Sequence, residues 1–327
     1  QDSSVQTFSL PIKIDIYAGG QKIRKDILIN GREQHFSFDV ASKPELIDFD
    51  VDKILVGEIN DNKTAEQYYY QYKNAPSYAN RIEALQFIMQ SKAASGQQIL
   101  LAGLKDKSAD LRALSIDGLN LADAQIKAAA LPIILELAKA DKDTEVRATA
   151  IAKLAETGDQ AYKSLFAAGV KDRSYKVIGA SLSALAKLAP QESTAAINAL
   201  DQDTKDHIAS AVAEIYINDA KDEHQSFFEN VMQTGDRTKV FSVVGAYFQY
   251  LGRNTNPAVT EKGVKNIGEA IERLKLQAYL SKQLSAAYGK TAQGKAQQAA
   301  SVSGEAKANL SKQAEIFKKA SADLVKE

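Results

Sequence analysis

A short motif recurs along the chain at intervals of about thirty residues, and this periodicity restricts the possible fold more than any other feature. The clearest copies are DKSADLRALSIDGL at 106–119, DKDTEVRATAIAKL at 141–154 and DRSYKVIGASLSAL at 172–185. Each begins with an aspartate, and an aliphatic anchor follows five residues later, at Leu111, Val146 and Val177. Further apolar residues stand five and eight positions after the anchor, which places them on one face of a helix.

The motif continues beyond these three copies. It extends upstream to Asn80-Arg81 and downstream to Ile208, and a poorer copy stands at Val240. An interval of this length has room for two short antiparallel helices, with the motif at the start of the second helix. The sequence therefore predicts an α-α superhelix, a solenoid of repeats like those of HEAT or armadillo proteins.

Two polar positions recur next to the anchors: a loop aspartate (Asp106, Asp141, Asp172) and an arginine (Arg81, Arg112, Arg147). We expect the aspartate to cap the helix that follows it, because its side chain can accept from free backbone N–H groups. Each arginine could bind a ligand or pair with the loop aspartate of its own or a neighbouring repeat. Pairing is the favoured interpretation, since it would stabilise the stacking of the repeats.

The first sixty residues follow a different pattern. From Phe8 to Ile16 every second residue is apolar, which predicts a strand with one buried face. Gly19-Gly20 then leads into a second strand over 23–29, and Asn30-Gly31, which suits a type I′ turn, leads into a third over 36–40.

Further extended segments follow through 47–51 and at 54–56. The predicted fold class is thus a multidomain β + α protein. A small β-sandwich occupies residues 1–60, a helical-repeat domain occupies 61–327, and capping helices begin at about residue 258. A stretch rich in Gln, Ala and Ser from Thr291 is expected to be a loose connection.

No catalytic motif is present in the sequence: HExxH, GxSxG, GxxxxGK[ST] and GxGxxG are absent, and there is no cysteine. Of the three histidines, His35 is expected on a solvated strand face. A zinc site made of His207, His224 and Glu214 is the alternative, but no two of these have the i, i+4 spacing of a helical metal site. We therefore expect no catalytic, cofactor-binding or metal-binding residue in this chain.

The charge balance does not indicate a binding partner. Lys and Arg together number 41, as do Asp and Glu, so no net field favours nucleic acid or an anionic membrane. No apolar run is long enough to cross a bilayer. A chain without cysteine suits the cytoplasm and the periplasm equally.

The one unusual aromatic group comprises Tyr68, Tyr69, Tyr70 and Tyr72, which we expect to pack the first repeat against the β region or to form a contact surface.

Three segments resemble a known family: FSLPIKIDIY at 8–17, ELIDFDVDKILV at 45–56 and YQYKNAPSYANRIEAL at 70–85. In their order they are similar to the third and fourth domains of the aminopeptidase N-like gluzincins, which are zinc exopeptidases. The resemblance implies that zinc and the catalytic residues lie in preceding domains of the same polypeptide. A chain that starts at Gln1 rather than Met is expected if it is a piece of such a polypeptide.

The same resemblance implies a function. The fourth domain of such enzymes arches over the active site and limits access to small peptides. The expected partners are then the N-terminal and catalytic domains and the peptide substrates, and no activity is expected of this chain alone. One alternative is a free-standing repeat scaffold that binds other proteins. The other is an enzyme with an unrecognised site.

Overall fold

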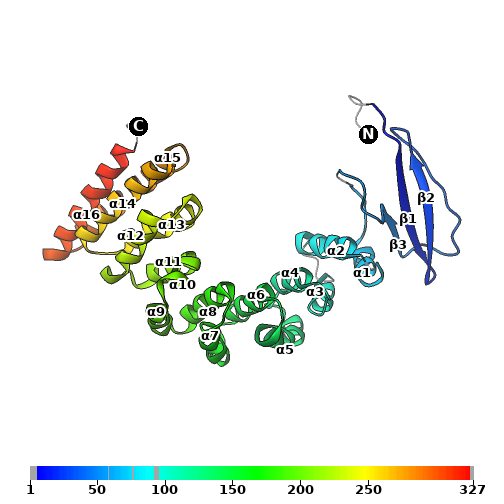
Figure 1. The fold of residues 1–327 in the computed structure, drawn as a ribbon, viewed down its shortest axis with the longest axis horizontal. Coiled ribbons are helices and arrows are strands. Elements are labelled where there is room, and N and C mark those ends of the chain that lie inside the picture. Colours follow the sequence, from blue (N-terminus) through cyan, green and yellow to red (C-terminus); the bar gives the residue numbers. More distant parts are fainter. Residues whose placement is uncertain (1–5, 58, 76, 92–95, 325–327) are drawn as a thin grey trace. The chain divides into compact units, whose positions relative to one another are not determined.

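The computed structural model describes residues 6–57, 59–75, 77–91 and 96–324, in which a three-stranded sheet is followed by helices. The chain divides into two compact units, residues 1–157 and 158–327. The predicted fold class, a β part followed by a helical-repeat solenoid, is confirmed (Figure 1). Gln1, on which the expectation of a longer polypeptide rests, lies outside the described residues.

The sheet contains β1 (Leu10–Ala18), β2 (Gln21–Ile29) and β3 (Leu46–Phe49), in the order β2-β1-β3. Both outer strands run antiparallel to β1. Gly19 and Gly20 form the two-residue turn between β1 and β2, and both have positive φ, as the predicted hairpin requires. The core of the sheet is a cluster of isoleucines from β1 and β2: Ile12, Ile14, Ile16 and Ile27.

The third predicted strand is wrong, because residues 36–40 form an irregular segment, as do residues 54–56. The side chain of Gln34 ends the backbone pairing of the sheet after β2. Its oxygen accepts from the N–H of Asn30, and its NH₂ group donates to the carbonyl of Leu28, both at 3.0 Å. β1 already has a partner on each side. The described β region is therefore a single layer, and α1 packs beside β3.

The helices of the first unit form two layers. The helices are α1 (Ala65–Asn74), α2 (Tyr78–Ser91), α3 (Gln97–Gly103), α4 (Ala109–Gly118), α5 (Ala124–Ala140) and α6 (Thr144–Ala155). In one layer α2 contacts α4 and α4 contacts α6, while in the other α3 contacts α5. The motif helices are the second of each pair, as predicted, and the anchors Leu111 and Val146 are fully buried.

The second unit continues the helical pairs. Its helices are α7 (Lys163–Gly169), α8 (Tyr175–Leu188), α9 (Pro190–Ala199), α10 (Gln202–His207), α11 (Ala209–Asp219), α12 (Gln225–Thr234), α13 (Arg237–Arg253), α14 (Pro257–Leu274), α15 (Gln277–Ala300) and α16 (Gly304–Asp323), with short 3₁₀ turns η2 (Gln160–Tyr162) and η3 (Asp222–His224). The motif helices α8, α11 and α13 pack in succession. The anchor Ile208 departs from the pattern, because it lies at the break between α10 and α11.

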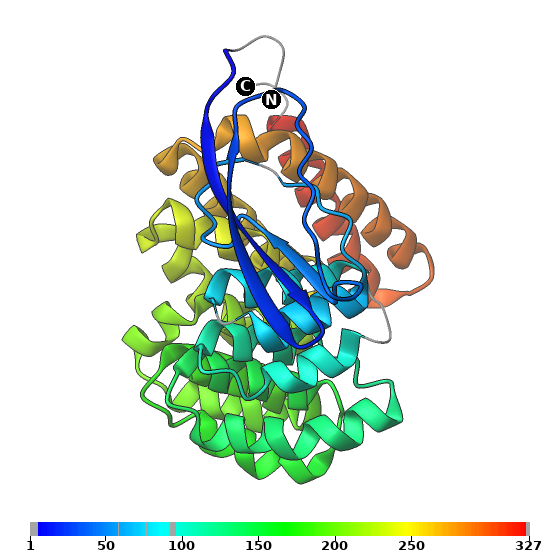
Figure 2. The same ribbon diagram turned by 90° about the vertical axis from the view of Figure 1, so that its right-hand side faces the viewer.

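The loose connection predicted from Thr291 is wrong. Residues 291–300 are the second half of α15, and only residues 301–303 separate it from α16. Ala, Gln and Lys are strong helix formers, and Ala292, Lys295 and Ala299 are buried at helical spacing. The two helices pack along their length as an antiparallel hairpin (Figure 2).

Candidate functional site

The repeat loops of the first unit are organised by their aspartates. Asp106 accepts from the backbone N–H of Ser108 at 2.8 Å, and Asp141 accepts from that of Asp143 at 2.9 Å. The predicted capping role is therefore wrong in detail: these aspartates close the loop, while the N-cap residues are Ser108 and Asp143. In the second unit Asp172 makes the same contact with the N–H of Ser174.

The arginines connect consecutive loops. Arg81 donates to Asp106 at 2.8 and 3.3 Å, and Arg112 donates to both oxygens of Asp141 at 2.7 and 2.8 Å. Arg112 also donates through Nη1 to the carbonyl of Asp106, and Arg147 does the same to the carbonyl of Asp141. Arg112 thus binds the backbone of its own loop and the carboxylate of the next loop.

The pairs Arg81–Asp106 and Arg112–Asp141 form an arginine–aspartate ladder, in which the opposite charges stabilise one another. Burial raises the pKa of Asp106 and Asp141, but hydrogen bonds from arginine and from backbone N–H groups outweigh it and hold both pKa values below the ordinary range. Tyr72 also donates to Asp106, at 2.9 Å. Arg81 and Arg112 are engaged with protein carboxylates, which is the arrangement that favours a structural role.

A second polar network joins β3 to the first two helices. Asp48 is fully buried and accepts from the amide of Asn80 at 2.7 Å. Gln71 donates to the carbonyl of Asn80 at 2.9 Å and to Glu83 at 3.0 Å. Lys53 lies 3.0 Å from Glu83 and 3.7 Å from Asp48. Burial raises the pKa of Asp48, and the nearby lysines oppose this only in part.

The apolar spacing of the sequence did not indicate this network. Ile47, Phe49 and Val51 alternate along the extended segment, but the structure buries Leu46 and Asp48 and leaves Ile47 48% exposed. A signal was present: Asp48 in β3 and Asp50 directly after it are two aspartates separated by one residue, and both are buried.

The tyrosine group does pack the first repeat against the sheet. The ring of Tyr70 meets that of Tyr17 on β1 edge-on, with centroids 5.7 Å apart. Tyr68 stacks on Phe87 of α2 at 4.0 Å. Tyr69 lies under the ammonium of Lys73. The predicted packing role is confirmed for Tyr70.

The histidines are held by different partners. His35 is exposed, as predicted, whereas His207 stacks on Tyr175 with centroids 4.1 Å apart. His224 is almost fully buried and stacks on Tyr216 at 3.9 Å.

The third member of the zinc alternative, Glu214, is exposed on α11. Within the described ranges, no group of three or more His, Cys, Asp or Glu side chains is arranged to hold a metal ion. None of the helices in these ranges combines the length and the apolar character that crossing a bilayer requires.

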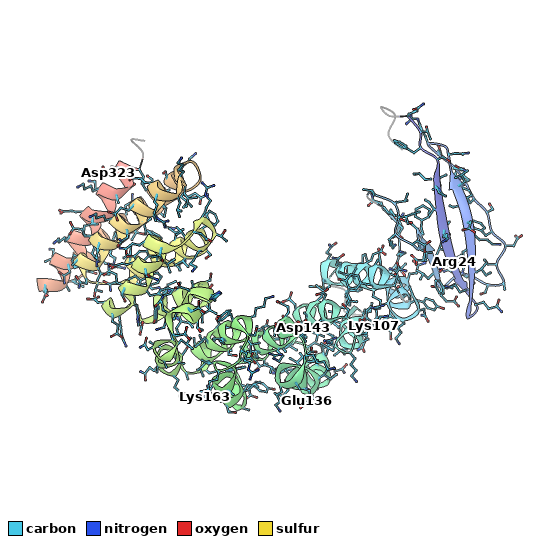
Figure 3. All side chains as sticks on the ribbon, in the orientation of Figure 1. Arg24, Lys107, Glu136, Asp143, Lys163 and Asp323 are labelled. Carbon is cyan, nitrogen blue, oxygen red and sulfur yellow. The ribbon has the colours of Figure 1, made fainter. Side chains whose placement is uncertain are left out.

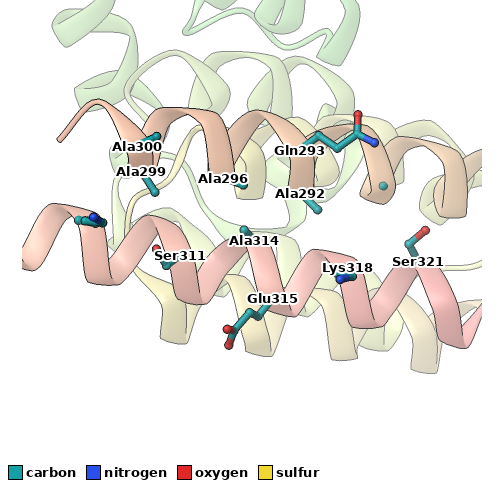
Figure 4. Close-up of a pocket in the computed structure, with 12 residues that line it drawn as sticks. Ala292, Gln293, Ala296, Ala299, Ala300, Ser311, Ala314, Glu315, Lys318 and Ser321 are labelled. Carbon is teal, nitrogen blue, oxygen red and sulfur yellow. The ribbon is translucent and has the colours of Figure 1, made fainter. Parts of the chain in front are cut away.

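The described part of the surface includes a groove and a group of exposed apolar side chains. A groove of about 740 Å³ lies between α15 and α16 (Figure 4). In that view Ala292, Ala296 and Ala299 point toward α16, and Ala314 points toward α15. Large exposed apolar side chains are concentrated before the first helix: Phe8, Leu28, Phe36, Ile47, Ile54, Val56 and Ile59.

Charged side chains project from the sheet and from the helices, and Figure 3 labels six of them: Arg24, Lys107, Glu136, Asp143, Lys163 and Asp323. Arg24 on β2 pairs with the buried Asp15 at 2.6 and 2.7 Å. Glu136 and Lys139 form an exposed pair along α5. Lys163 pairs with Glu192 in the second unit. No charge of one sign dominates, which agrees with the balanced composition.

Comparison with known proteins supports the helical repeats. A model of the HEAT-repeat family matches residues 97–186, which include α3 to α7 and most of α8. No curated protein matches the chain.

Solved structures that are similar to this chain include the following two. Aminopeptidase A of Legionella pneumophila, crystallised in complex with aspartic acid, has a TM-score of 0.52 and 12% identity. The comparison covers 94% of this chain but only 45% of that protein. The YibA protein of Escherichia coli has a TM-score of 0.45 and 16% identity, with coverage of 83% and 100%. The comparisons therefore show a helical-repeat fold, with HEAT repeats in the middle of the chain.

Proposed function

We propose that this chain is a non-catalytic region of a zinc aminopeptidase, which covers the active site and limits the access of peptides to it. The observation that carries the proposal is the order of the parts. In this chain a sheet precedes helical repeats, and 94% of the chain is covered by the comparison with an aminopeptidase, of which the chain spans less than half. Zinc and the catalytic groups would be supplied by the remainder of the parent polypeptide.

The exposed apolar side chains of the β region support this proposal. Ile54, Val56 and Ile59 lie in the segment between β3 and α1, and all three are exposed. An exposed group of large apolar residues is typical of a surface that contacts another domain. In the parent this segment would contact the catalytic domain.

The arginine–aspartate ladder suits the proposed role. A helical-repeat region that limits substrate size must not deform when a longer peptide contacts it. Arg112 fixes the loop of one repeat to the loop of the next through three hydrogen bonds. Packed repeats with such connections have low compressibility and deform little, so they exclude bulky ligands.

A free-standing helical-repeat scaffold for protein partners is the alternative. It is favoured by the HEAT match, because residues 97–186 are matched without any enzyme domain. In that case the exposed apolar segment would contact a separate protein.

The coding sequence upstream of Gln1 provides the first test. We expect it to continue into a segment that contains HExxH, and the zinc-loaded full polypeptide should then release N-terminal residues from peptides. A full polypeptide without zinc-dependent peptidase activity would favour the scaffold.

A variant of the full polypeptide then tests the covering role. Ile54→Asp with Val56→Asp should weaken the contact between the β region and the catalytic domain. The kcat/KM for long peptides should rise relative to that for dipeptides, because access is less restricted. Val302→Asp, at an exposed apolar residue between α15 and α16, is the matched control. An unchanged ratio in the double variant would contradict the proposal.

A further inference from the structure

A pocket of about 400 Å³, with polar side chains among a partly apolar lining, lies in the second unit, beside α9 and the end of α11. Its polar lining includes Thr194 and Asn198 from α9, and Asn218, Asp219, Lys221 and Glu223 from the end of α11 and the following turn. It lies outside the motif positions, and none of the roles described above uses it.

The turn after α11 brings charged residues together. Ala220 ends the helix in the left-handed conformation, with φ 43° and ψ 38°. This conformation is unfavourable for a residue with a side chain and reverses the direction of the chain. Asp219 and Lys221, on either side of Ala220, consequently line the same pocket.

A buried histidine orients the first carboxylate. Nε2 of His224 lies 2.8 Å from Oδ1 of Asp219 and donates to it. His224 is fixed in turn by stacking on Tyr216, with ring centroids 3.9 Å apart. One oxygen of Asp219 is thus anchored to the interior, and the other, Oδ2, is paired with Lys221.

The same tyrosine orients an amide on the other wall. The hydroxyl of Tyr216 donates to Oδ1 of Asn198 at 3.2 Å. The oxygen of this amide is therefore occupied, and its NH₂ group remains as a donor for a carbonyl oxygen.

An internal cation already occupies the space between the carboxylates. Nζ of Lys221 lies 3.5 Å from Oδ2 of Asp219 and 3.9 Å from Oε1 of Glu223. These separations are too long for strong hydrogen bonds, and the lysine side chain is 58% exposed. Such a lysine is displaced easily, because exposed ion pairs contribute little.

We propose that this pocket binds the arginine side chain of a peptide. The guanidinium would take the place of the Lys221 ammonium and donate to Asp219 and Glu223, while Asn198 donates to a carbonyl of the peptide. A planar guanidinium suits two carboxylates better than an ammonium does, because its N–H groups form a fixed fork. The proposal is independent of the peptidase role and concerns this chain by itself.

Titration of the isolated chain with N-acetylarginine amide, followed by calorimetry or NMR, tests the proposal. Binding is expected, and the neutral analogue N-acetylcitrulline amide should bind at least about tenfold more weakly because charge-assisted hydrogen bonds are lost. Asp219→Asn should weaken arginine binding about tenfold for the same reason. Lys221→Met should strengthen it about threefold, because the internal competitor is removed.

Glu269→Gln on α14 removes one negative charge outside the pocket and should leave binding unchanged. Circular dichroism establishes that each variant folds, and Glu223→Gln replaces Asp219→Asn if the latter does not. Equal binding of the arginine and citrulline ligands would overturn the proposal. So would absence of binding to both the wild type and Lys221→Met, or tight binding that persists in Asp219→Asn and Glu223→Gln.

Discussion

Arg112 shows how a single side chain stabilises a repeat array. Its three nitrogens contact the backbone of one loop and the carboxylate of the next, 29 residues further along the chain. Asp141 is almost fully buried, so its charge depends on this partner. The recurrence of Asp and Arg beside the anchors allowed the pairing to be predicted, because both partners belong to the repeat.

Replacing Arg112 with Ala should lower the free energy of unfolding by about 2–4 kcal/mol, because Asp141 remains buried without its partner. Urea unfolding followed by circular dichroism measures the change. Lys139→Ala is the matched control, since it removes an exposed pair with Glu136 and should cost less than about 0.5 kcal/mol. Similar values for the two variants would contradict the role of the ladder.

The same variant should alter the pH dependence of stability. The folded pKa of Asp141 is lower than the unfolded value of 3.8, so its contribution is fully present above that value and is lost as the pH falls through the folded pKa. The wild type should therefore lose stability more steeply below about pH 4 than Arg112→Ala does. Parallel pH profiles would show that the arginine does not set this pKa.

The helices α3 and α4 approach each other closely where Gly103 faces Ser115. A Cβ at Gly103 would lie 2.0 Å from Oγ of Ser115 and 2.9 Å from its Cβ. The absence of a side chain on one helix thus permits the close contact between the two helices of a repeat. Sequence periodicity indicated both helices but not which of their small residues faced each other.

Gly103→Ala should lower the free energy of unfolding by about 1–3 kcal/mol, because the helices must separate or distort. Introducing Ser115→Gly in the same chain should recover part of the loss. Gly245→Ala on α13 is the control: its Cβ would meet nothing within 4 Å, so stability should rise by about 0.5–1 kcal/mol. Thermal unfolding of the variants provides the comparison, and a neutral Gly103→Ala would show that the helices can adjust.

Other elements illustrate where local patterns fail. The segment 36–40 alternates like a strand but joins no strand of the described sheet, and the side chain of Gln34 instead bonds the backbone of Leu28 and Asn30 at the end of β2. The stretch from Thr291 looked flexible because it is polar and rich in small residues. Its alanines instead allow α15 to pack closely on α16.

At the scale of the whole molecule, the sheet depends on the helices beside it. The fully buried residues of its core are few. The third strand, β3, has only four residues, so the sheet is little more than the β1–β2 hairpin, and an isolated hairpin is marginally stable. Asp48 on β3 obtains its hydrogen bond from Asn80 on α2. The sheet and the first helices lie in one compact unit, and the predicted boundary at residues 60 and 61 stays a prediction.

A peptide of residues 1–60 should therefore remain unfolded, whereas residues 1–157 should fold cooperatively. The shorter chain lacks the contacts of Tyr17 with Tyr70 and of Asp48 with Asn80. Dispersion of amide proton signals in NMR spectra distinguishes the two states. A well-dispersed spectrum from residues 1–60 would establish the β region as an independent domain.

The sequence by itself determined the periodic features of this protein: the alternating first strand, the glycine turn, the motif helices with their buried anchors, and the arginines beside the loop aspartates. Each follows from residues that are close in the chain or repeated along it. The tertiary structure alone decided the single-layer sheet, the network around Asp48 and the pocket beside α11. These features depend on which strand has a free edge and which side chains meet across elements, and such contacts between distant residues leave no regular spacing in the sequence.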